Sequence, residues 1–73
     1  MIYVVAQVNS GKLSPTLGQL KICESYEKAV EVGVSWAKKQ CDKLEEEIRE
    51  ELSDDGDFYD PSGEWSICIG MPD

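Results

Sequence analysis

The sequence predicts a small α+β domain with the element order β-β-α-β, in which one long helix packs on one face of a three-stranded antiparallel sheet. Three patterns indicate this fold. Residues 2–9 alternate between two faces and are rich in β-branched side chains, which is typical of a half-buried strand. Apolar residues recur every three or four positions over residues 30–52, which is typical of an amphipathic helix. A second alternating run covers residues 64–70.

The first two strands are expected to form a hairpin around a turn rich in Gly, Ser and Pro. The second strand is expected over residues 17–23. In it, Leu20 and Ile22 are predicted to face the core, whereas Gln19 and Lys21 are predicted to face solvent. The weaker alternation of this strand indicates an edge position.

One long helix is expected over residues 26–52, after Ser25 as N-cap. If it is unbroken, it is about 40 Å long and extends beyond the sheet. Gly33 on its apolar face is expected to allow close backbone packing. The apolar row narrows in the second half of the helix, so that end is expected to be only partly covered. The row consists of Val30, Val34, Ala37, Cys41, Leu44, Ile48 and Leu52.

The last strand is expected over residues 64–70, after a loop that follows the helix. If this strand lies beside the first, every neighbouring pair is antiparallel and the spatial order is 2-1-3. No linker divides the chain, so residues 1–73 are expected to form a single domain.

The composition limits the functional classes that the chain can belong to. It has 73 residues, 41% of them hydrophobic, and this favours a folded globule over a disordered acidic tail. Cys23, Cys41 and Cys68 are odd in number and widely spaced, which favours reduced thiols in a cytoplasmic protein. Neither a signal peptide nor a membrane-spanning segment is recognised.

No pattern of catalytic residues is recognised, and we expect a non-catalytic protein without a cofactor. The chain has no His, no C-x-x-C and no Gly-rich phosphate loop. The segment 54–60 resembles a calcium loop, but Tyr59 and Asp60 break the EF-hand pattern. Weak binding of divalent cations by this segment is therefore only a minor alternative, and no metal site is predicted.

Charge is distributed very unevenly along the chain. Residues 1–41 contain five basic and three acidic residues, whereas residues 42–73 contain two basic and twelve acidic residues. The formal charges of +2 and −10 add to the net charge of −8. Such a charge disfavours direct binding to nucleic acids or anionic membranes and favours a basic protein surface as the partner.

The acidic residues are densest in the second half of the predicted helix, at about one net charge per 3.4 Å, which is similar to one strand of duplex DNA. Two interpretations are open: a solvated face that keeps a small protein soluble, and a negative surface that matches a basic groove. In the second, Phe58 and Tyr59 would supply apolar anchors. The predicted partner-binding residues are Asp42, Glu46, Glu47, Glu50, Glu51, Asp54, Asp55, Asp57, Phe58, Tyr59 and Asp60.

In size, charge asymmetry and lack of catalytic residues, the chain resembles as a class the small acidic proteins that bacteriophages use to block host machinery, including anti-CRISPR proteins and DNA mimics. This resemblance implies inhibition in the host cytoplasm by electrostatic and steric occlusion of a nucleic-acid-binding channel. The alternative is a structural module that forms a homodimer through an exposed helix seam. That seam would consist of Cys41, Leu44, Ile48 and Leu52.

Overall fold

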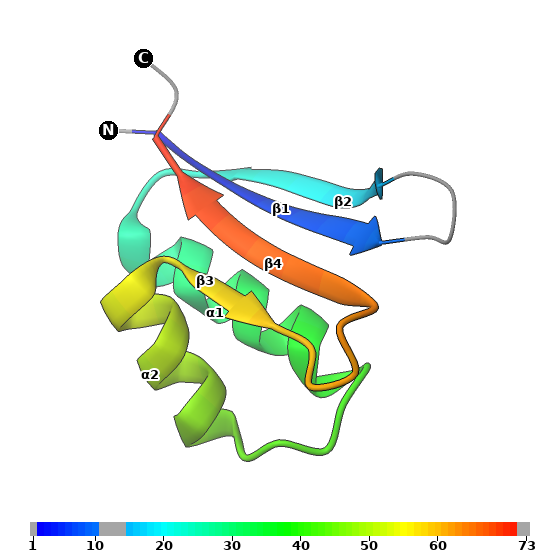
Figure 1. Cartoon of the computed structure of the whole chain (residues 1–73). Helices are drawn as coiled ribbons and strands as arrows, with labels where there is room; N and C mark the ends of the chain where they lie inside the picture. Colours follow the sequence, from blue (N-terminus) through cyan, green and yellow to red (C-terminus); the bar gives the residue numbers. More distant parts are fainter. Residues whose placement is uncertain (1, 11–14, 72–73) are drawn as a thin grey trace.

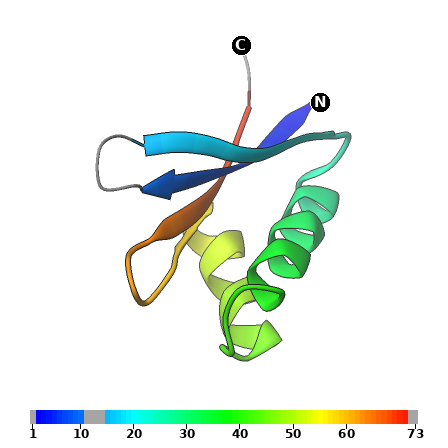
Figure 2. The ribbon, with the colours of Figure 1, turned by 90° about the vertical axis from the view of Figure 1, so that its right-hand side faces the viewer.

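Two helices cover one face of a four-stranded antiparallel sheet, and no other helix or strand of the described residues covers the opposite face (Figures 1 and 2). The computed structural model describes residues 2–10 and 15–71. The α+β class is as predicted, but the sheet has four strands and the helix is divided in two. The elements are β1 (Tyr3–Ser10), β2 (Pro15–Cys23), α1 (Tyr26–Lys38), α2 (Glu45–Asp55), β3 (Asp57–Tyr59) and β4 (Trp65–Gly70).

The sheet order is β2-β1-β4-β3, so β1 lies between the hairpin partner β2 and the distant β4. This central part of the predicted order is confirmed. The prediction of three strands is wrong because the segment after α2 adds β3 along the outer edge of β4. Gly56 makes this possible: at φ 75° it ends α2 and turns the chain back, and its carbonyl accepts a 2.8 Å hydrogen bond from the Ile69 amide. A three-residue strand is too short to show alternation in the sequence.

The prediction of one long helix is also wrong, because α1 ends at Lys38 and residues 39–44 connect it to α2. Burial explains the break. Ile48 and Leu52 would extend past the sheet on a continuous helix, whereas a separate α2 packs back against α1 and buries both completely. Full burial of such a side chain contributes about 1.5–3 kcal/mol. The predicted N-cap of α1 is confirmed: the Ser25 hydroxyl accepts a hydrogen bond of 3.2 Å from the Lys28 amide.

The sheet turns a different set of β2 side chains to the helices than predicted. β1 buries Val5 and Gln7 on the helix side, and the register places Cys23 of β2 on that side as well. Leu20 and Ile22 consequently face away from the helices and are 53% and 63% exposed. Their predicted inward orientation is therefore wrong. Because side chains alternate along a strand, the choice of Cys23 as the core residue decides the orientation of the others.

The core lies between the helix layer and the sheet. Phe58 and Trp65 pack together there with their ring centroids 5.8 Å apart. Gly33 has the predicted packing role, since a Cβ atom at this position would lie 2.8 Å from Leu52 Cδ1 and 3.4 Å from Ile67 Cγ2. The buried apolar residues are Val5, Cys23, Ala29, Val30, Val34, Ala37, Ile48, Leu52, Phe58, Trp65 and Ile67.

A buried glutamine ties the connection between the helices to the sheet. The Gln7 amide exchanges two hydrogen bonds of 2.8 Å with the amide of Gln40. Its nitrogen also donates to Asn9 and its oxygen also accepts from Gln19, both at 3.0 Å. All four hydrogen-bonding positions of the Gln7 amide are thus used. Gln40 in addition donates to the Trp36 carbonyl at the end of α1, and so it helps to end that helix.

Candidate acidic interaction surface

The acidic side chains of α2 form one surface that points away from the core. Because Ile48 and Leu52 occupy the buried side of this short helix, the carboxylates project from the opposite side. A shallow groove of about 410 Å³ lies between several of these side chains and Lys43. We call the following six residues the acidic surface: Glu46, Glu47, Glu50, Glu51, Asp54 and Asp55.

The two basic residues near α2 neutralise little of this surface. Lys43 lies 3.6 Å from Glu51 Oε2 and 5.4 Å from the centre of the Phe58 ring. Arg49 forms ion pairs with Glu31 of α1 and, at 3.7 Å, with Glu45. In the described part of the chain, the other five carboxylates of the acidic surface have no ion-pair partner. The surface therefore keeps most of its negative charge.

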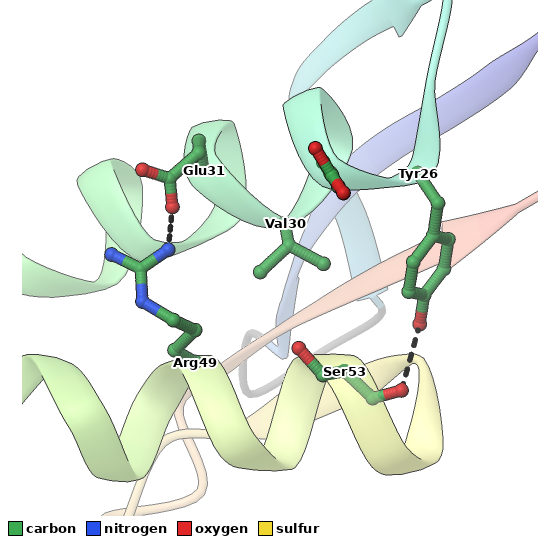
Figure 3. A pocket seen from close by; sticks show the side chains of 6 residues that line it. Tyr26, Val30, Glu31, Arg49 and Ser53 are labelled. Carbon is green, nitrogen blue, oxygen red and sulfur yellow. Dashed lines mark hydrogen bonds and ion pairs between the residues drawn. The ribbon is translucent and has the colours of Figure 1, made fainter.

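A second groove, of about 580 Å³, runs between α1 and α2 (Figure 3). Its polar groups hold the two helices together. Arg49 of α2 pairs with Glu31 of α1, and the Tyr26 hydroxyl donates to the carbonyls of Leu52 and Ser53 at 2.6 and 3.4 Å. These contacts engage three of the six side chains that line the groove, those of Tyr26, Glu31 and Arg49, so we assign it a structural role.

The division of the helix changes the electrostatic cost of the acidic run. Glu45, Glu46 and Glu47 lie in the first turn of α2, where the helix dipole favours negative charge. Asp54 and Asp55 lie in the last turn, where it disfavours negative charge and where α2 has no basic residue. The helix dipole therefore disfavours only the charges of Asp54 and Asp55.

The remaining predicted partner-binding residues lie in different parts of the structure, outside the acidic surface. Phe58 is 1% exposed, so its predicted role as an interface anchor is wrong: a strand that pairs with β4 turns this ring into the core. Asp57 and Tyr59 flank Phe58 on β3 and point to the other face of the sheet, where Tyr59 is 67% exposed. Asp42 is exposed in the connection before α2.

Asp60 belongs to the turn between β3 and β4. Its carboxylate accepts a hydrogen bond from the Ser62 hydroxyl, and its carbonyl accepts one of 2.8 Å from the Gly63 amide. These bonds are typical of a turn that shapes its own backbone. We therefore read Asp60 as a turn residue that lies apart from the acidic surface.

The predicted helix seam is not an exposed row. Ile48 and Leu52 are fully buried within the chain and Cys41 is half-buried, whereas Leu44 alone is largely exposed, at 65%. The spacing of these apolar residues is the same in an exposed seam and in a buried helix face, and here α2 packs this face against α1. The premise of a dimer through this row is therefore wrong.

The segment 54–60 is not a loop, because it contains the end of α2 and all of β3. Within residues 2–10 and 15–71, no group of three or more Cys, Asp or Glu side chains is placed to hold a metal ion. Over the same residues, no helix is long and apolar enough to cross a membrane.

A helix on one face of the predicted sheet implied an uncovered opposite face, but the residues that form this face were not predicted. On β1 this face contains Val4, Ala6 and Val8. The sequence showed that these side chains share one face of the strand, but not whether that face points toward the helices. We call the following nine residues the open sheet face: Val4, Ala6 and Val8 of β1, Leu17, Leu20 and Ile22 of β2, and Ser66, Cys68 and Gly70 of β4.

Comparisons of the chain with models of known protein families, with curated proteins and with solved structures found no match.

Proposed function

We propose that this chain is a small, non-catalytic inhibitor whose acidic surface binds a basic, nucleic-acid-binding surface of a host protein complex. The class we favour is that of phage-encoded proteins that act in the host cytoplasm, such as anti-CRISPR proteins and DNA mimics. The observation that carries the proposal is the acidic surface of α2: five of its six residues are exposed, and within the described residues only Glu51 has an ion-pair partner.

The charge density of α2 supports a resemblance to nucleic acid. Residues 45–55 contain seven acidic residues and Arg49, so their formal charge is −6. Over a helix about 16 Å long, this is about one net charge per 2.7 Å. The value lies between those of one DNA strand, about 3.4 Å, and of the duplex, about 1.7 Å. A groove lined by Arg and Lys that accepts a phosphate backbone would meet similar charge on α2.

The proposed mechanism is occlusion. α2 would occupy part of the basic channel and the rest of the domain would block access to it, so no chemical step is needed. Charge attraction of this kind accelerates association and weakens as salt is added. Tyr59 points to the face of the sheet opposite the helices, so we assign most of the binding to α2.

A solvated surface is the competing explanation, and Asp54 and Asp55 argue against it. Both lie at the end of α2 where a basic residue would be more stable, and acidic residues elsewhere would provide equal solubility. Residues that lower stability at an exposed site are often kept for function.

A capture experiment from a bacterial lysate, performed at low and at high salt after nuclease treatment, tests the proposal. We expect the chain to retain nucleic-acid-binding proteins at low salt and to release them at high salt. Added heparin should also release them, because it competes as a polyanion. The captured complex should bind its own nucleic acid less well when the chain is present.

Two variants with the same change in charge make the test specific. E46Q/E50Q/D54N removes three charges from the acidic surface, whereas E24Q/E27Q/E64Q removes three exposed charges elsewhere. The proposal predicts that only the first variant loses the partner. Equal retention by both variants would contradict it, as would capture that is insensitive to salt.

A further inference from the structure

The open sheet face is an apolar surface that the described chain leaves uncovered. Leu17, Leu20 and Ile22 of β2 are each more than half exposed there, beside the partly exposed Val4, Ala6 and Val8 of β1. The helices lie on the opposite side (Figure 2). A contiguous apolar patch of this kind on a small protein usually marks an interface.

We infer that the open sheet face binds a second copy of this chain, with the two sheets packed face to face. This inference does not depend on the proposed function, because it concerns a different face of the molecule. It rests on three observations: the shape of the face, its lack of charge, and the position of the acidic surface.

The face has a self-complementary shape. β2 contributes the large side chains Leu17, Leu20 and Ile22, whereas β4 contributes the small residues Ser66, Cys68 and Gly70. β1 lies between them. A two-fold axis along β1 would place β2 of each copy over β4 of the other, so that large side chains meet small ones. A symmetric dimer requires such a patch, and sheets commonly pack in this aligned manner.

The face contains no charged residue. On the same side of the sheet, β3 carries the carboxylate of Asp57, beside Cys68 in the register. With the axis along β1, β3 would lie outside the partner's β2, so Asp57 would stay at the solvated rim. The dimer would therefore bury no unpaired charge. Burial of an unpaired charge would strongly oppose association.

The net charge of −8 opposes self-association in general, but α2, which carries the acidic surface, lies on the opposite side of the sheet from this interface (Figure 2). Packed sheets are about 10 Å apart, and a helix layer adds about 10 Å on each side. The two acidic surfaces would thus be separated by about 30 Å, several times the screening length of about 8 Å at physiological salt. Repulsion between them would be weak.

The size of the face fits a reversible dimer. Three strands about 4.8 Å apart and about seven residues long have a flat footprint of about 330 Å² per copy. Projecting side chains add to this, so the pair would bury on the order of 1,000 Å², near the lower limit of specific interfaces. We therefore expect dimerisation to depend on concentration.

Sedimentation analysis from about 10 μM to about 1 mM tests the inference, because a reversible dimer of this size should form within that range. We expect the wild-type mass to rise from monomer to dimer. L20E should weaken dimerisation at least tenfold, whereas the matched control L44E adds the same charge at an exposed leucine outside the face and should have no effect. Circular dichroism verifies that both variants fold. A wild-type monomer at every concentration, an unaffected L20E dimer, or an equal loss in L44E would each overturn the inference.

Cys68 provides a second readout in the unmodified protein. Its thiol is exposed on the open sheet face, whereas Cys23 is buried and Cys41 is half-buried between the helices. In reducing buffer, we expect alkylation of Cys68 to slow as the dimer forms and that of Cys41 to be unchanged. A Cys68 rate that does not change while the mass doubles would show that the copies meet elsewhere.

Discussion

The Tyr26 hydroxyl donates a hydrogen bond of 2.6 Å to the carbonyl of Leu52, and this contact joins the start of α1 to the end of α2. The same carbonyl accepts a 3.0 Å bond from the amide of Gly56. α2 has no basic residue in its last turn, so the phenol supplies a positive hydrogen where the helix dipole is negative.

Replacing Tyr26 with Phe should lower the free energy of unfolding by about 1 kcal/mol, because the Leu52 carbonyl loses one of its two donors. Urea denaturation followed by Trp fluorescence measures the change. Tyr59→Phe is the control, since that side chain is largely exposed and should change stability by less than about 0.5 kcal/mol. Equal effects of the two variants would contradict the assigned role of Tyr26.

Gln40→Ala should lower the free energy of unfolding by about 1–2 kcal/mol, because it leaves the buried Gln7 amide with one unpaired donor and one unpaired acceptor position. Gln7→Ala should cost at least as much, since that side chain is buried. The two effects should be strongly non-additive in Q7A/Q40A, as expected for directly paired groups. Additive losses would show that the reciprocal pair is not the source of the stability.

Leu52→Ala should lower the free energy of unfolding by about 2–5 kcal/mol, because it creates a cavity between α2, Gly33 and Ile67. Leu44→Ala should change it by less than about 0.5 kcal/mol, because Leu44 is 65% exposed. The two residues belong to the same apolar row in the sequence, so the pair measures which of its members α2 buries. Similar losses would indicate that α2 does not dock as described.

Asp54→Lys and Glu46→Lys make the same change in charge at opposite ends of α2. Asp54→Lys should stabilise the protein by about 0.5–1 kcal/mol more than Glu46→Lys does, because the dipole favours a cation only at the C-terminal end. Thermal unfolding at low salt measures the difference, which should shrink as salt is added. If the acidic surface binds a partner as proposed, Asp54→Lys should lose binding although the fold becomes more stable.

Sequence periodicity predicted the features that depend on a single helix or strand, such as where an element lies and where it begins. The alternation of residues 64–70 predicted β4, and Ser25 predicted the start of α1. The neighbours of the central strand were also predictable, since a helix crossing the sheet leaves few arrangements for a later strand.

The errors arose where tertiary contacts decide between local alternatives. The row from Cys41 to Leu52 fits an exposed seam and a buried helix equally well, and only the packing of α2 on α1 distinguishes them. β2 offered two possible sets of inward residues, and its pairing with β1 selected the set that includes Cys23. The acidic surface was predicted as a group of residues, but its separation from Phe58, Tyr59 and Asp60 depends on β3.

The pairing of β1 with β4 also constrains the order of folding. Val4 lies opposite Gly70, so the middle of the sheet closes only after nearly the whole described chain is available. The β1–β2 hairpin and α1 depend on nearby residues and can form early, but a hairpin alone is marginally stable in water. Pairing across such a long sequence separation slows folding. During synthesis, one edge of β1 would therefore remain unpaired until β4 has been made. Removal of residues 65–71 should leave an incomplete sheet that aggregates.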